Sequence, residues 1–361
     1  MKLSYCDNYE RTQKYAEAMW NHEMLDRPFA CVTGVKRGMA LPKEGVFECP
    51  RNGFLAMTMG DYAPIFNTFE EIASATFYGG EALPWFNINP GPDIFAGYLG
   101  GKLRCVPYSD TTWAEKTVED WEDYPIRLDR SPEGYFEKTR AYIEYAAGRS
   151  EGKYLTGMMD LHGNMDAMSA LRGPEDLCCD LIDCPDTVFR KLQEINDLYP
   201  EVYNMIYEAG RISERGTLGW IPTYCKGKFA VLQCDFIALI SPEMCRKYVM
   251  PAIERESEFL DHCIYHLDGP DALRHLDDVL ALPRLDMIQW VPGDGQPRTV
   301  EWMDVLKKCQ AAGKSVLIYD WTEEELRTKL KELDPALVAI TYNAGTQDKA
   351  EAFLDWLEKE Y

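Results

Sequence analysis

The sequence predicts a mixed α/β protein in which eight parallel strands form a TIM, or (β/α)8, barrel with an N-terminal helical extension. Two observations lead to this fold class. From residue 153 onward, short apolar segments alternate with stretches of helical length, which is the order of consecutive βα units. The apolar segments also lack alternating polar positions, which indicates strands that are buried on both faces, as in a barrel.

The N-terminal part of the chain contains two of the eight predicted strands, over 29–35 and 83–88. The second of them runs into Asn89-Pro90-Gly91-Pro92, a sequence typical of the end of a strand. The other elements expected here are a helix over 8–26, a Gly/Pro-rich loop over 36–60, a short extra strand over 103–108 and a helix over 132–148.

The other six strands are expected at regular spacing, each followed by helical sequence. The strands are 153–159, 230–235, 262–267, 286–291, 315–319 and 337–342. The helices are 174–183, 186–210, 242–261, 270–281, 299–312, 322–332 and 347–360. Because no repeat, low-complexity tract or linker divides the sequence, residues 1–361 are expected to form a single domain, a length that a barrel with insertions accommodates.

Composition restricts the class of partner. The chain is 46% hydrophobic and 27% charged, with a formal net charge of −22. This excess of negative charge argues against nucleic acids and anionic membranes as partners. The first residues lack the apolar core of a signal peptide, and no run of 18 apolar residues predicts a membrane span. We expect a soluble protein that acts on a small molecule, and the sequence does not predict its oligomeric state.

The twelve cysteines include no Cys-x-x-Cys pair, and several of them lie in apolar segments. A zinc ribbon and a thioredoxin-like motif are therefore not predicted. Buried free thiols in a reducing compartment are the expected state, which places the protein in the cytoplasm.

Candidate functional residues occur at the end of the predicted strand 262–267. His266 and Asp268 are two positions apart, so they point to the same face of the strand, about 6–7 Å apart along it. An imidazole and a carboxylate in this arrangement can share a divalent metal ion. Alternatively, Asp268 begins a loop and caps the helix at 270, while His266 forms hydrogen bonds inside the barrel.

Two other strand ends carry polar residues. Asp235 ends the strand 230–235, and Asp160 and His162 follow the strand 153–159. Residues at the C-terminal ends of barrel strands line the active site. We therefore expect Asp235 near the chemistry, and Asp160 and His162 in contact with the substrate. A structural cap at Asp235 and turn hydrogen bonds after Asp160 are the alternatives.

Aromatic and amide side chains indicate a flat apolar ligand with one polar edge. Gln289 and Trp290 end the strand 286–291 and are expected to face the same pocket as His266, although packing within the barrel is the alternative for Trp290. Asn89 follows the strand that contains Trp85 and is expected to contact the ligand. Glu81 precedes this strand, so a catalytic role for it would require the chain to bend back.

Several segments between residues 153 and 295 occur in a distinctive order. They are Gly157–Asp160 with Gly173–Leu177, Val231–Phe236 with Ser241–Glu243 and Val249–Pro251, His266–Gly269, and an Asp-x-Ile-x-Trp pattern at 286–290. This order resembles the uroporphyrinogen decarboxylase superfamily, which includes the decarboxylase and corrinoid-dependent methyltransferases, all single TIM barrels. His266–Gly269 stands where the methyltransferases carry His-x-Cys-Gly.

Differences from the family pattern limit the reaction and the metal ligands that the resemblance implies. Thr33–Gly38 does not match the Arg-Gln-Ala-Gly-Arg signature of the decarboxylase, and Tyr342–Thr346 lacks the histidine of its Gly-His-Gly loop. The octaanionic porphyrinogen also needs many cations. Decarboxylation of uroporphyrinogen is therefore not expected. The methyltransferases bind zinc through His, Cys and a later Cys, of which only His266 matches, with Asp268 at the first Cys and Asn343 near the second.

The resemblance implies transfer of a methyl group from a small methylated substrate to the corrinoid of a separate partner protein. A mixed oxygen and nitrogen donor set would favour an oxygen substrate, such as the methoxy group of an O-methyl aromatic, over a thiol. His266 and Asp268 would hold zinc or deliver a proton, and Asp235 and His162 would orient the substrate. Trp85 and Trp290 would stack on it. One alternative is a lyase or decarboxylase of the same fold that acts on a substrate smaller than uroporphyrinogen. The other is a non-catalytic binding barrel.

Overall fold

The computed structural model describes residues 2–41, 53–105 and 111–361 as a mixed α/β structure. Seven strands form its main sheet: β1 (Phe29–Val35), β2 (Thr76–Gly80), β7 (Phe229–Leu232), β8 (His262–Asp268), β9 (Met287–Val291), β10 (Ser315–Ile318) and β11 (Val338–Thr346). Their order is β2-β1-β11-β10-β9-β8-β7. All neighbours are parallel except β1 and β2, which are antiparallel.

Two further strand pairs lie outside this sheet. Strands β3 (Trp85–Phe86) and β6 (Leu155–Thr156) pair in parallel, and β4 (Lys102–Cys105) pairs with β5 (Thr112–Glu115) in the antiparallel sense. Segments next to this pair form further backbone hydrogen bonds. The amide of Glu81, before β3, donates to the Ala30 carbonyl of β1 at 2.9 Å, and the Met158 amide donates to the Leu218 carbonyl, before β7, at 2.6 Å.

The eight predicted strands are confirmed as β1, β3, β6 and β7 to β11. The predicted extra strand at 103–108 corresponds to β4, while residues 106–108 lie outside the described residues. Strand β2 is not predicted by the sequence, because two of its five residues are glycines, which weaken the strand signal.

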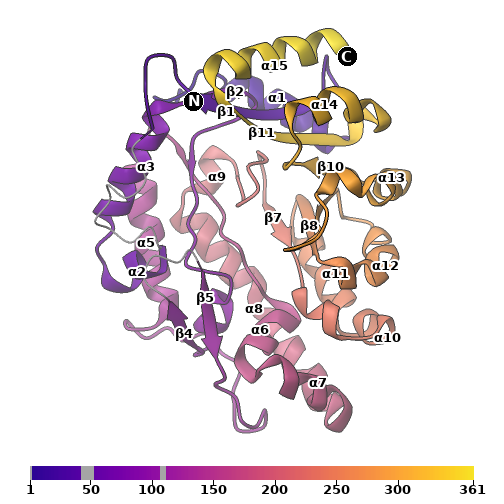
Figure 1. Cartoon of the computed structure of the whole chain (residues 1–361). Helices are drawn as coiled ribbons and strands as arrows, with labels where there is room; N and C mark the ends of the chain where they lie inside the picture. Colours follow the sequence, from indigo (N-terminus) through magenta and orange to yellow (C-terminus); the bar gives the residue numbers. More distant parts are fainter. Residues whose placement is uncertain (1, 42–52, 106–110) are drawn as a thin grey trace.

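Helices cover the sheet on its outer side (Figure 1), with α11 to α13 next to strands β7 to β10 and α15 over β1 and β2. The helices are α1 (Tyr9–Trp20), α2 (Gly53–Met59), α3 (Ala63–Ala75), α4 (Ile94–Tyr98), α5 (Tyr135–Arg149), α6 (Asn164–Arg172), α7 (Pro174–Asp183), α8 (Pro185–Ala209), α9 (Ile212–Arg215), α10 (Pro242–Met244), α11 (Met250–Phe259), α12 (Leu276–Leu280), α13 (Met303–Ala311), α14 (Glu323–Lys329) and α15 (Gln347–Glu360).

Three helical predictions differ from the structure. The helix predicted over 8–26 ends at Trp20, shortly before His22 with its positive φ of 57°. The helix predicted over 242–261 is interrupted by a π turn at Cys245–Val249, just before Pro251, which has no N–H to continue the α-helical ladder. The loop predicted over 36–60 contains helix α2, which buries Phe54 and Met57, while residues 42–52 lie outside the described residues.

Buried side chains alternate between two core clusters along the strands. The inner cluster takes residues from seven strands, namely Phe29 and Cys31, Leu155, Phe229 and Val231, Ile264, Met287, Leu317 and Ala339. Their strand neighbours, such as Tyr265 and Ile288, join the outer cluster with the helices. Tyr9, Met19 and Trp20 of α1 also belong to the inner cluster. The strands are thus buried on both faces, as the continuous apolar segments predict.

The Glu81 side chain has a structural role, in contact with Arg27 and strand β1. Its carboxylate forms two hydrogen bonds of 2.8 Å with the Arg27 guanidinium and accepts a third, of 2.9 Å, from the Ala30 amide of β1. Both charged side chains are fully buried. The pair therefore ties the segment before β3 to strand β1, which explains why this carboxylate precedes its strand.

Six buried cysteines carry free thiols: Cys31, Cys225, Cys234, Cys245, Cys263 and Cys309. Among the described residues, no helix is both long enough and apolar enough to span a membrane.

Candidate functional site

The alternation of the strands places several predicted residues on the inner side of the sheet. On β8, Ile264 belongs to the inner core, so His266 and Asp268 point the same way, further toward the end of the strand. The same alternation on β9 turns Gln289 inward after Met287. After β7, the Gln233 side chain donates a hydrogen bond to Asp160, and Asp235 can present a ligand atom within 4.8 Å of those of His266 and Asp268. Because these strands are parallel, their C-terminal ends meet at one end of the sheet.

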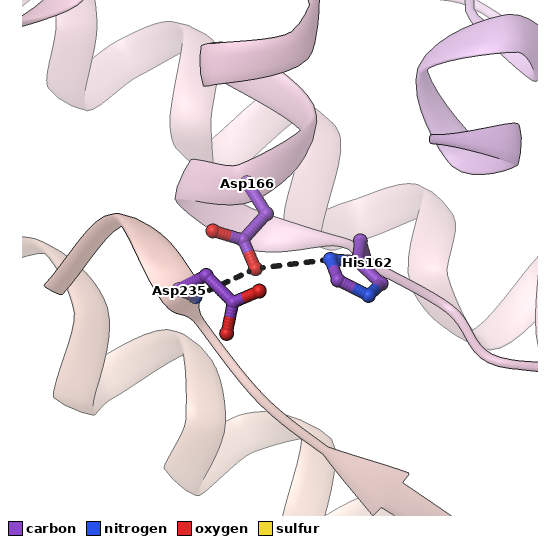
Figure 2. A group of neighbouring side chains, drawn as sticks. All are labelled: His162, Asp166 and Asp235. Atoms are coloured by element: carbon purple, nitrogen blue, oxygen red, sulfur yellow. Dashed lines mark hydrogen bonds and ion pairs between the residues drawn. The ribbon is translucent and has the colours of Figure 1, made fainter. Parts of the chain in front are cut away.

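His162 lies between two carboxylates. Its Nε2 is 3.0 Å from Asp160 Oδ2. Its Nδ1 is 3.4 Å from Asp166 Oδ2, a contact drawn in Figure 2. Asp160 also accepts a hydrogen bond from the side-chain amide of Gln233. Burial alone would lower the pKa of His162, but Asp160 and Asp166 together raise it well above its ordinary value. Both ring nitrogens face carboxylate oxygens, an arrangement that favours the protonated imidazole.

Asp166 connects His162 to the residues after β7. It lies in the first turn of α6 and accepts hydrogen bonds from the backbone amides of Asp235 at 3.0 Å and Phe236 at 2.9 Å. Burial opposes ionisation of Asp166, but hydrogen bonds from His162 and these two amides lower its pKa overall. The sequence analysis does not identify this residue, although its four-residue spacing from His162 at the start of a helix is a signal that could have done so.

Asp235 is exposed on its outer side but lies close to other carboxylates. Desolvation, followed by the charge of Asp166, raises the pKa of Asp235 to about 6, although His162 and His266 oppose this shift.

His266 is oriented by a different partner. Its Nδ1 lies 2.6 Å from the side-chain oxygen of Gln289, and the ring of Trp220 packs edge-on at 5.1 Å. An amide oxygen only accepts hydrogen bonds, so this contact assigns the ring proton to Nδ1 and leaves a lone pair on Nε2. Asp235, His266 and Asp268 can each present one ligand atom within 4.8 Å of the others. His162, Asp166 and Asp235 form a second such group.

A cavity of about 500 Å³ adjoins this cluster, a size that suits a small ligand. His162, Asp166 and Asp235 line one part of it, and Asp93 and Lys116 line another. Asp93 was not identified from the sequence. Burial raises its pKa, while a hydrogen bond of 2.7 Å from the Ala114 amide and the charge of His162 act in the opposite direction.

The expectation that Trp290 faces the same pocket as His266 and Gln289 is wrong. The Trp290 side chain is 1% exposed and belongs to the outer core cluster. It packs against Trp302 with ring centroids 5.2 Å apart. Successive side chains of a strand point to opposite faces, so an inward Gln289 requires an outward Trp290.

Trp85 and Asn89 lie on a separate cavity of about 460 Å³, together with Asn87. The His/Asp cluster, which comprises Asp160, His162, Asp166, Asp235, His266 and Asp268, does not line this cavity. The side-chain oxygen of Asn89 accepts a hydrogen bond of 3.0 Å from the Gly91 amide, which is the contact of a turn. Trp85 covers Gly157, where a Cβ atom would lie 2.6 Å from the indole ring. The structure therefore joins Asp160, His162, Asp235, His266, Asp268 and Gln289 through a chain of contacts. Trp85 packs against the inner core cluster and lines the separate cavity together with Asn89.

Comparison with known proteins adds a structural relative. No protein-family model and no curated protein matches the sequence. Among solved structures, a methyltransferase from Methanosarcina mazei matches with a TM-score of 0.60 at 12% sequence identity. The match covers 97% of this chain and 98% of that chain. The two proteins thus share a fold over their full lengths, and the reaction has to be argued from the residues of the site.

Proposed function

We propose that this protein is a methyltransferase of the uroporphyrinogen decarboxylase superfamily that moves a methyl group from a small methylated substrate to a corrinoid carried by a partner protein. The observation that carries the proposal is the grouping of Asp235, His266 and Asp268 at the ends of two adjacent strands. The fold shared with a methyltransferase supports it. So does the position of His266-x-Asp268, where the family's methyltransferases carry their first two zinc ligands.

The proposal includes closure of the eight parallel strands into a TIM barrel. The inner core cluster supports closure, because it gathers inward side chains from β1, from β6 and from each of β7 to β11. In such a barrel, the His/Asp cluster occupies the C-terminal end, where barrel enzymes place their active sites.

The donor set of Asp235, His266 and Asp268 fits a divalent ion such as zinc. It offers one imidazole nitrogen and two carboxylates, all of them ligands that zinc accepts. The hydrogen bond from His266 Nδ1 to Gln289 is the kind of outer contact that fixes the ring of a metal-binding histidine. When bound, the ion would act as a Lewis acid toward the substrate oxygen that bears the methyl group.

The remaining residues of the site would bind the substrate and supply a proton. In the proposed reaction the methyl–oxygen bond breaks and its electron pair stays on the oxygen. The methyl group bonds to cobalt(I), which supplies the electron pair of the new bond. His162, charged between Asp160 and Asp166 on the wall of the cavity, would donate a proton to the leaving oxygen.

The test uses the purified protein, free cob(I)alamin as methyl acceptor, and a panel of methoxy aromatics, methylamines and methyl thioethers. Formation of methylcobalamin is followed by absorbance. We expect methyl transfer from the oxygen-linked donors, because the donor set is rich in oxygen and lacks a thiolate. Failure with every donor would contradict the proposal.

A second candidate is a decarboxylase or lyase that acts on a substrate smaller than uroporphyrinogen. The observation that favours it is the position of His162 between two carboxylates on the cavity wall, because loss of carbon dioxide leaves a carbanion that needs a proton. Release of carbon dioxide from a small carboxylated substrate, without methyl transfer, would identify this activity.

A further inference from the structure

A buried carboxyl group lies directly behind the segment that carries His162 and Asp166. Glu256 of α11 is 4% exposed, and Asn164 is 1% exposed. The side-chain amide of Asn164 donates hydrogen bonds to Glu256 Oε1 at 3.4 Å and to the Gln233 carbonyl at 3.1 Å. Asn164 thus links helix α11 to the segment that follows β7.

The backbone at this point adopts an unfavourable conformation. Asn164 has a φ of 43°, in the left-handed region that most residues with a side chain rarely adopt and that asparagine enters more readily than most. The preceding Gly163 faces Glu256 so closely that a Cβ atom there would lie 3.2 Å from Oε1. This turn starts α6 and sets the relative positions of His162 and Asp166, and such strain persists only where surrounding contacts enforce it.

The carboxyl group of Glu256 can remain uncharged at its buried position on α11. No ion pair of the described residues involves it. Desolvation, with a further contribution from Asp166, raises the pKa of Glu256 to about 8, although the Asn164 amide lowers it. As a neutral acid, Glu256 can hold Asn164 without placing an unpaired charge in the protein interior.

We infer that Glu256 is a positioning residue of the candidate active site, which acts through Asn164 to fix the backbone between His162 and Asp166. The inference rests on the proposed function for its catalytic consequence only. Without Glu256, the turn would relax toward a common backbone conformation, and the 3.4 Å contact between His162 and Asp166 would be lost.

The test compares Glu256→Gln, which keeps the size and the hydrogen-bonding capacity, with Glu256→Leu, which keeps only the bulk. Glu254→Leu, an exposed position on the same helix, is the control. The first readout is the NMR signal of the His162 ring, assigned with His162→Gln. We expect Glu256→Leu to shift this signal. We expect Glu256→Gln and Glu254→Leu to leave it unchanged. This readout needs no substrate, so it remains decisive if methyl transfer is not found.

The second readout is methyl transfer. We expect Glu256→Leu to lower kcat by about 10- to 100-fold with little change in KM, and Glu256→Gln to stay within about twofold of the wild type. If Glu256→Leu does not fold, Asn164→Gly replaces it, because glycine accepts the positive φ but lacks the amide. An unchanged His162 signal in the folded variant, or equal damage by Glu256→Gln, would overturn the inference.

Discussion

The buried pair of Arg27 and Glu81 offers a test of how strand β1 is joined to β3. Replacing Glu81 with alanine removes both 2.8 Å hydrogen bonds to Arg27 and the 2.9 Å bond from the Ala30 amide. The guanidinium, whose side chain is fully buried, would lose its main carboxylate partner. Loss of one partner of a buried pair typically costs about 3–5 kcal/mol, and we expect Glu81→Ala to destabilise the protein by this amount.

Urea unfolding at neutral pH, followed by circular dichroism, measures this cost. The double variant Arg27→Met/Glu81→Leu is the matched comparison, because two apolar residues in place of a buried pair are often neutral or stabilising. We expect the double variant to be more stable than Glu81→Ala. A loss below about 1 kcal/mol for Glu81→Ala would refute the reasoning. Glu81 is also expected to have no catalytic effect beyond this instability, because its carboxylate binds Arg27 and β1.

Three further predictions concern the site and its surroundings. The pKa of Glu256 is about 8 in the folded chain, so the native state keeps a proton that the unfolded chain releases above its ordinary pKa of about 4.3. The contribution of Glu256 to the free energy of unfolding should therefore fall by about 3–5 kcal/mol as pH rises from about 4 to 8. Glu256→Gln should remove most of this fall. Denaturation at several pH values across this range measures it. His266→Ala and Asp268→Ala should lose bound zinc, whereas His262→Ala, at the opposite end of β8, should keep it. Elemental analysis measures the zinc content. Equal zinc in all three variants would count against the metal site. His162→Gln should lower methyl transfer by about 10²- to 10⁴-fold, and a change below about threefold would exclude its role as proton donor.

The positions of the strands could be predicted from the sequence because they are buried on both faces. A strand such as β7 or β10 is then a continuous run of apolar residues bounded by polar ones. Strand β2 could not be found in this way, because it is short, rich in glycine and only partly buried.

The site was predicted in part, and the reason lies in the alternation of side chains. Asp235, His266 and Asp268 stand at strand ends, where position alone predicts that they converge. The sequence does not show whether Gln289 or Trp290 faces inward. A strand that carries apolar residues on both faces has no alternating pattern from which to decide it. Asp166 was missed because it lies within α6, beyond the left-handed turn at Asn164, although its four-residue spacing from His162 could have indicated it.

The most direct test of the proposed function compares methylcobalamin formation by the wild type, His266→Ala and His262→Ala with the best methyl donor of the panel. Both substituted histidines belong to β8, but only His266 lies in the His/Asp cluster. We predict methyl transfer by the wild type and by His262→Ala, and a loss of about 10²-fold or more for His266→Ala. Equal rates for the two variants, or no methyl transfer by the wild type, would contradict the account.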